Sequence, residues 1–185
     1  IDWSYANSCN SNRVLIILHG LDGNAQRPYV IGLAHHFNHH GWDVAAINFR
    51  GCSGEINKLY RSYNAGASED LNHVVTNILS NNKYESLAIN GFSLGGNLLL
   101  KYLGERNHLP HELKAAVAIS APCALYASLK KIDESRNWLY SKRFVMQLKK
   151  QLLLREKHFP EKITKEQITN CTNLFSIDEL YTSQA

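Results

Sequence analysis

One serine stands in a setting that suits nucleophilic chemistry. Ser93 is the centre of a Gly-x-Ser-x-Gly motif at 91–95, with the apolar run 87–89 before it and a helical apolar pattern after it. A strand, this turn and a helix form a nucleophile elbow, which pushes the serine hydroxyl into solvent. Gly91 and Gly95 lack a Cβ, so neighbouring backbone can pass close to the turn. The pattern predicts that Ser93 attacks an acyl carbon.

Two backbone N–H groups are predicted to stabilise the oxyanion that such an attack creates. Leu94 begins the helix after the elbow, where N–H groups lack intrahelical acceptors and the helix dipole favours negative charge. The loop His19-Gly20-Leu21 directly follows the apolar run 14–18, and a loop in this place supplies a second donor. We therefore expect the N–H groups of Leu21 and Leu94 to form an oxyanion hole, with Gly20 as a loop glycine beside it. The side chain of His19 is expected to fix the loop by hydrogen bonds, and not to act as the general base.

Other polar residues have simpler interpretations. Ser53 does not fit the Gly-x-Ser-x-Gly pattern and is expected in a turn, while Arg50 and Glu55 either line the site or pair with each other. Four histidines form two i, i+4 pairs on one predicted helix: His35, His36, His39 and His40. No glutamate lies between them as in HExxH, so we expect a solvated helix face and no metal site.

The elements that must position Ser93 alternate between strand and helix as far as residue 122. Uninterrupted apolar runs, typical of strands covered on both faces, predict strands at 14–18, 44–47, 87–89 and 115–119. Amphipathic patterns between them predict helices, one of which begins near Pro28. Residues 1–12 suit the end of an edge strand. We therefore expect a mostly parallel sheet flanked by helices over residues 1–122.

The pattern changes after Pro122. Residues 123–185 show helical spacing and no convincing strand, which predicts an all-helical lid. Phe144, Leu148 and Leu152 recur every four residues and predict a buried stripe. Two sequences that resemble capping boxes predict the starts of short helices: Thr164-x-x-Gln167 and Ser176-x-x-Glu179.

Basic residues accompany the apolar stripe of the predicted lid: Lys142, Arg143, Lys149, Lys150, Arg155 and Lys157. A solvated face is the more ordinary interpretation of such a run. Weak contact with an anionic membrane surface is the alternative, because basic amphipathic helices bind lipid head groups.

The composition fits one domain of ordinary size. The 185 residues are 44% hydrophobic and 19% charged, with a net charge of +4. The sequence has no dense basic stripe interleaved with aromatic residues, so we do not expect it to bind nucleic acid. Four cysteines at positions 9, 52, 123 and 171 lie far apart, which favours reduced thiols and a cytoplasmic protein over a zinc site or a disulfide framework.

Several motifs in chain order carry a more specific resemblance. They lie at 19–23, 48–55, 61–66, 91–97 and 120–122. Together they closely resemble the YheT-like branch of the α/β-hydrolase superfamily, which is related to animal abhydrolase-domain lipases and esterases. The resemblance implies an α/β-hydrolase fold and the hydrolysis of small-molecule or lipid carboxylic esters by a Ser-Asp-His triad. It matches Ser93 to the nucleophile and implies no metal or organic cofactor.

The same resemblance also implies where the acid and the histidine of the triad lie. In this branch the acid and the histidine follow the lid, so we expect them beyond residue 185 and the fold incomplete at both ends. Five candidates in the lid or the preceding loop are not expected to take these roles: His108, His111, Asp133, His158 and Asp178. Two functions stay open: a serine esterase of which this fragment is inactive alone, and a non-catalytic α/β-hydrolase-like module that binds a ligand or partner.

Overall fold

The structure is a computed structural model that describes residues 1–7 and 10–181, so Cys9 lies outside the described residues. It divides into two compact units. The core unit comprises Ile1–Ser53 and Ala65–Pro122, and the lid unit comprises Gly54–Asn64 and Cys123–Ala185. The division after Pro122 coincides with the change in sequence pattern. The segment Gly54–Asn64 groups with the helical unit, although it lies between two core segments in the sequence.

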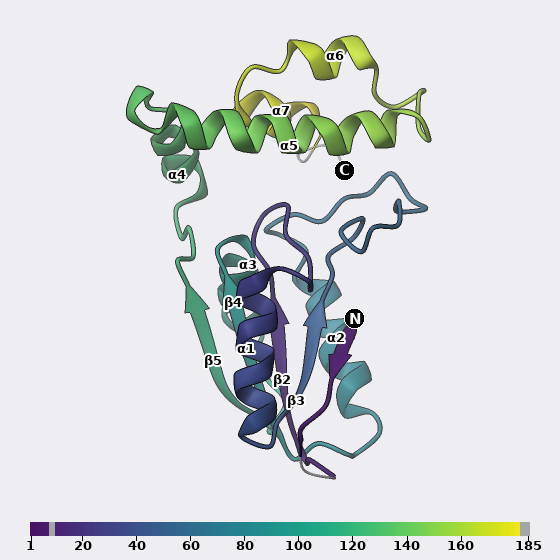
Figure 1. The fold of residues 1–185 in the computed structure, drawn as a ribbon, viewed down its shortest axis with the longest axis vertical. Coiled ribbons are helices and arrows are strands. Elements are labelled where there is room, and N and C mark those ends of the chain that lie inside the picture. The colour runs from purple at the N-terminus through teal and green to yellow at the C-terminus, as the bar shows by residue number, and fades with distance from the viewer. Residues whose placement is uncertain (8–9, 182–185) are drawn as a thin grey trace. The chain divides into compact units, whose positions relative to one another are not determined.

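Five strands of the core unit form one sheet in the order β1-β3-β2-β4-β5 (Figure 1). Their bounds are β1 (Asp2–Ser4), β2 (Arg13–Leu18), β3 (Asp43–Ile47), β4 (Ser86–Phe92) and β5 (Leu113–Ile119). β2 to β5 pair in parallel, and β1 pairs with β3 in the antiparallel direction. The predicted strands and the predicted edge strand are confirmed. Leu18 at the end of β2 lies opposite Gly91 of β4, so the loops that follow these strands meet at one edge of the sheet.

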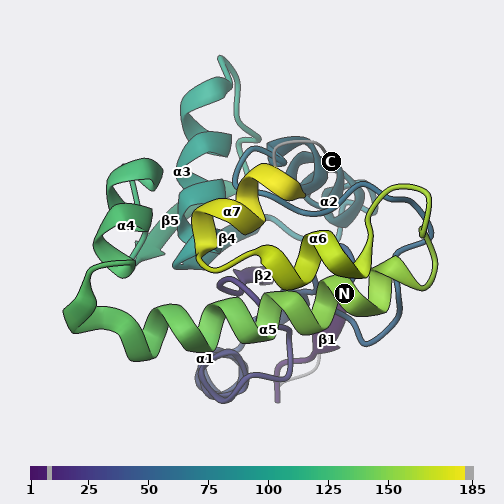
Figure 2. The same cartoon turned by 90° about the horizontal axis from the view of Figure 1, so that it is seen from above.

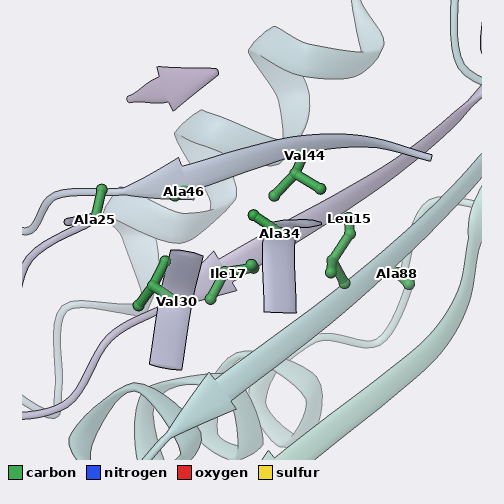
Figure 3. Packing of buried hydrophobic residues seen from close by; sticks show 8 residues of the cluster. All are labelled: Leu15, Ile17, Ala25, Val30, Ala34, Val44, Ala46 and Ala88. Atoms are coloured by element: carbon green, nitrogen blue, oxygen red, sulfur yellow. The ribbon is translucent and has the colours of Figure 1, made fainter. Parts of the chain in front are cut away.

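Helices cover both faces of this sheet, as Figure 2 shows for α1 (Pro28–His39) on one side and α2 (Ser68–Leu79) with α3 (Leu94–Glu105) on the other. The inner strands β2, β3 and β4 are continuous apolar runs because both of their faces are buried, whereas β5 is largely exposed. On the α1 side, Leu15 and Ile17 of β2 join a buried cluster with Val30 of α1 (Figure 3). This packing fixes the strand ends from which the site loops leave.

All helices of the lid unit lie after Pro122, and residues 123–181 contain no strand, as the sequence predicts. It contains α4 (Leu125–Ile132), the short 3-10 helix η1 (Ser135–Asn137), α5 (Trp138–Glu156), α6 (Lys165–Asn170) and α7 (Leu174–Leu180). Phe144, Leu148 and Leu152 of α5 pack in one hydrophobic cluster with α6 and α7. None of the helices within the described ranges combines the length and the apolar character that a membrane span requires.

One of the two predicted capping boxes is correct and the other is wrong. Thr164 and Gln167 cap α6 reciprocally, as the sequence predicts. At α7 the N-cap is Asn173, whose Oδ1 accepts a hydrogen bond of 2.8 Å from the N–H of Ser176, while the Ser176 Oγ accepts from the N–H of Asn173. Ser176 is thus the third residue of the helix, and Leu174, its first residue, is buried in the cluster.

The Asn173 cap of α7 predicts which of two neighbouring variants lowers stability. Asn173→Ala removes the side-chain acceptor and should lower the stability of the lid unit by about 1 kcal/mol. Thr172→Ala, at an exposed position directly before the cap, serves as the control and should leave stability unchanged. Urea unfolding followed by far-ultraviolet circular dichroism measures both. Equal losses in the two variants would contradict the Asn173 cap.

Candidate active site

Ser93 lies between β4 and α3 in a backbone conformation that side chains rarely adopt. Its φ is 50° and its ψ is −116°, and its side chain is exposed. Such conformations are strained and persist only where the surroundings impose them. Here the Ser93 N–H donates to the carbonyl of Ile119 over 2.8 Å, and the Ser93 carbonyl accepts from the N–H of Asn97 over 3.0 Å. Both ends of the residue are therefore fixed, and the hydroxyl is the part left at the surface.

Three glycines make room for this turn. A Cβ on Gly91 would lie 2.4 Å from the carbonyl oxygen of Gly95, and a Cβ on Gly95 would lie 2.5 Å from that of His19. Real Cβ atoms do not approach backbone so closely, so neither position accepts another residue without a shift of the main chain. Gly96, which the site prediction did not include, packs against the loop after β5, since its Cβ would lie 2.9 Å from the Cβ of Ala121.

The loop after β2 passes directly beside the Ser93 hydroxyl. A Cβ on Gly20 would lie 3.2 Å from the Cβ and 3.8 Å from the Oγ of Ser93. The loop turns back at once, because the N–H of Gly23 donates to the carbonyl of Gly20 over 3.0 Å. Asp22 takes a positive φ of 54° within this turn. The structure therefore brings together Gly20 and Ser93, which are 73 residues apart in the printed sequence.

The two expected oxyanion donors flank this meeting point along the chain. Leu94 is the first residue of α3, so its N–H has no intrahelical acceptor. Leu21 is the second residue of the Gly20–Gly23 turn, whose own hydrogen bond uses the N–H of Gly23. The N–H of Gly20 is engaged elsewhere, by the hydroxyl of Tyr29 at 3.1 Å.

Tyr29 is a support that the sequence prediction missed. It lies in the first turn of α1, its hydroxyl accepts a hydrogen bond from the loop and its ring packs on Phe92, with 4.7 Å between centroids. Phe92 directly precedes Ser93, so one side chain contacts both halves of the site. The sequence signal that could have identified this support is a tyrosine in the first helical turn after the loop that follows β2.

His19 holds the loop from within the core, as the sequence predicts. It is fully buried, its Nδ1 lies 2.7 Å from the carbonyl oxygen of Gly20, and its Nε2 accepts from the N–H of Phe49 over 3.2 Å. These partners assign the proton to Nδ1. Burial is the main cause that lowers the pKa of His19, and the positive charge of Arg27 adds to it, while the bond to Gly20 opposes both. The ring is therefore neutral, and backbone occupies both of its nitrogens.

Asn97 connects the elbow helix to the segment after β5. Its Nδ2 donates to the carbonyl of Pro122 over 2.9 Å, and Ser120 in the same segment takes a positive φ of 51°. Asn97 and Ser120 lie in the motifs at 91–97 and 120–122, but the sequence alone did not predict this role for Asn97. A polar residue in the first turn of an otherwise apolar helix was the signal.

The remaining candidates have other partners or lie at the surface. Arg50 forms a two-pronged ion pair with Asp70, with both N–O distances 2.6 Å. That hydrogen-bonded carboxylate raises the pKa of Arg50. Ser53 lies on an exposed bend with no helix after it, as expected. The four histidines of the α1 region are exposed: His35, His36, His39 and His40. Residues 1–7 and 10–181 contain no group of three or more His, Cys, Asp or Glu side chains arranged to hold a metal.

Comparison with known proteins gives a consistent result. A family model described as alpha/beta hydrolase fold matches residues 13–164. YheT of Escherichia coli is 31% identical over 173 residues, which are 92% of this chain and 50% of YheT. Phospholipase ABHD3 of Mus musculus is 25% identical over 190 residues, which are 99% of this chain and 46% of that protein. The solved structure of the Pyrococcus furiosus esterase Pf2001 is 25% identical with a TM-score of 0.56, over 74% of this chain and 51% of that one. The chain spans about half the length of these curated relatives.

The neutral state of His19 predicts a pH-dependent stability of the loop. Because its pKa is lowered below 6.5 in the fold, its contribution is fully present above pH 6.5 and is lost as pH falls toward the folded pKa. His19→Gln keeps an acceptor for Phe49 and does not titrate. Urea unfolding between about pH 5 and pH 8 should show a steeper loss for the wild type than for His19→Gln. Identical pH profiles would show that His19 is not held neutral.

Proposed function

Because the chain belongs to the α/β-hydrolase fold family, we propose that it carries the nucleophile and the oxyanion hole of a serine esterase. The observation that carries this proposal is the strained elbow at Ser93, with the turn at Gly20 3.2 Å from its Cβ. A strained turn that exposes a hydroxyl beside a second loop is the arrangement that acyl transfer requires. A relative named as a phospholipase and a solved structure named as an esterase support carboxylic esters of small molecules or lipids as the substrate class.

The proposed reaction begins with attack of the Ser93 Oγ on the ester carbonyl carbon. The carbonyl electron pair moves onto oxygen, and the N–H groups of Leu21 and Leu94 donate hydrogen bonds to that oxyanion. Donors that are already fixed in place need no reorganisation during the reaction, and each is worth about 3–4 kcal/mol in the transition state. Collapse of the tetrahedral intermediate releases the alcohol and leaves Ser93 acylated, and water then releases the acid.

The serine hydroxyl needs a base to take its proton and an acid to orient that base. His19 does not fill the role of the base, since backbone groups bind both of its nitrogens. We place the histidine and the aspartate of the triad outside residues 1–185. The support for this part of the proposal is that the chain spans about half the length of its relatives. Residues 1–185 alone should then hydrolyse esters poorly.

Labelling by a fluorophosphonate probe tests the nucleophile. The protein expressed from its complete reading frame should be labelled on Ser93, and Ser93→Ala should abolish labelling because the attacking oxygen is gone. Ser53→Ala is the matched control, a second exposed serine next to a glycine turn, and should label like the wild type. Equal labelling of wild type and Ser93→Ala would sink the assignment. No labelling of either, in folded protein, would favour the non-catalytic binding module.

The lid unit suggests a second property, weak contact with an anionic membrane surface. Three consecutive residues at the start of α5 expose 59%, 64% and 67% of their surface: Trp138, Leu139 and Tyr140. Lys142 lies over the Trp138 ring at 5.9 Å from its centroid, and the neighbouring Arg143 is exposed. Aromatic and aliphatic side chains flanked by cations suit the boundary between head groups and acyl chains.

Vesicle sedimentation tests this contact. The protein should bind vesicles of phosphatidylcholine with phosphatidylglycerol at low salt and detach as salt screens the attraction. Trp138→Ser with Leu139→Ser should abolish binding, whereas Leu100→Ser, an exposed leucine of α3 in the core unit, should not. Absence of binding by the wild type, or equal binding to pure phosphatidylcholine, would exclude the proposed contact.

A further inference from the structure

Arg155 does not belong to the solvated basic face on which the sequence analysis placed it. It lies in the last turn of α5 and exposes only 8% of its surface. Its guanidinium is surrounded by three aromatic rings, with centroids 5.7 Å away for Tyr60, 5.5 Å for Phe159 and 5.2 Å for Tyr181. Burial of a charge is costly unless its surroundings compensate for it, and ring faces attract a cation. The position therefore has a specific structural role.

The guanidinium holds the backbone of a segment that is distant in the sequence. Its Nη2 donates to the carbonyl of Leu59 over 2.9 Å and also to the carbonyl of Tyr60. The hydroxyl of Tyr181, just after α7, donates to the same Tyr60 carbonyl over 3.1 Å. The Tyr60 ring packs edge-on against both Tyr181 and Phe159, with centroid distances of 5.3 Å and 5.7 Å. Two lid helices thus hold one short stretch of Gly54–Asn64.

The connectivity makes this attachment unusual. Gly54–Asn64 leaves the core unit after Ser53 and returns to it at Ala65, yet it forms one compact unit with the lid helices. A connection of this length between a strand and a helix would otherwise be an independent surface loop. We propose that Arg155 is a positioning residue that makes Gly54–Asn64 a structural part of the lid, so that the segment and the helices move as one body. The proposal rests on contacts within the lid unit and does not depend on the esterase proposal.

The chemistry of the contact explains why arginine occupies this position. A planar guanidinium can stack against rings while its fixed N–H groups reach two adjacent carbonyls. A lysine ammonium keeps the charge but has no plane to stack and no fixed pair of donors. Arg155→Lys should therefore loosen the segment almost as much as Arg155→Ala, which would distinguish the proposed clamp from a simple need for positive charge.

Hydrogen–deuterium exchange read by mass spectrometry tests the clamp. Loss of two charge-assisted hydrogen bonds should speed exchange in the 54–64 peptides by at least about tenfold in Arg155→Ala and Arg155→Lys. Arg143→Ala removes an exposed arginine from the same helix and should behave like the wild type. Peptides of α1 in the core unit should exchange at the same rate in all variants.

Coupling also has to operate in the reverse direction, because linkage between two sites is reciprocal. Tyr60→Ala, made in the segment, should speed exchange at the end of α5 and in α7. Leu59→Ala removes a 62% exposed side chain and keeps the backbone carbonyl, so it should leave those helices unchanged. If Tyr60→Ala speeds exchange only in 54–64 and leaves α7 unchanged, the segment and the helices do not move as one body.

A general loss of lid structure in Arg155→Ala would show as fast exchange throughout α5, α6 and α7. In that case Tyr181→Phe decides, because it removes only the hydroxyl that donates to Tyr60. It should speed exchange in 54–64 by a few-fold, with α6 intact, because the hydroxyl also hydrogen-bonds to Ser62 of the same segment. Wild-type exchange of 54–64 in both Tyr181→Phe and Arg155→Lys would overturn the proposal.

Discussion

The left-handed backbone of Ser93 is the constraint on which the rest of the core unit depends. A φ of 50° at a residue with a side chain costs free energy, and the packing around it has to supply that free energy. The close approaches at Gly91 and Gly95 permit the turn, and the hydrogen bonds of Ser93 to Ile119 and Asn97 fix it. Because β2, β4 and β5 all contribute partners, the elbow forms only when the parallel sheet is complete at this edge.

The parallel sheet also explains why two short motifs far apart in the sequence meet. Neighbouring parallel strands end at the same edge, so the loop after β2 and the turn after β4 become neighbours without any further device. His19 and Tyr29 then hold the β2 loop by its backbone, one through the carbonyl and the other through the N–H of Gly20. Both act on the main chain, and the main chain is the part of this loop proposed to bind the oxyanion.

Sequence reasoning succeeded where the physical signal is local or periodic. Continuous apolar runs predicted the strands β2 to β5, and the glycine spacing around Ser93 predicted the elbow. It failed for contacts between residues that no local or periodic pattern connects. Tyr29 with Gly20 is one example, and Arg155 with Tyr60, 95 residues apart, is another. The α7 cap shows a third case. Asn173 and Ser176 are both good N-cap residues, and the helix that begins at the buried Leu174 uses Asn173.

We propose that Ser93 and two backbone N–H groups form one site for acyl transfer. The most direct test is a crystal structure of the protein from the complete reading frame after reaction with a phosphonate ester, which mimics the tetrahedral intermediate. We expect a bond from phosphorus to the Ser93 Oγ and a phosphonyl oxygen about 2.7–3.1 Å from the nitrogens of Leu21 and Leu94. An adduct on another residue, or a phosphonyl oxygen directed away from both nitrogens, would contradict it.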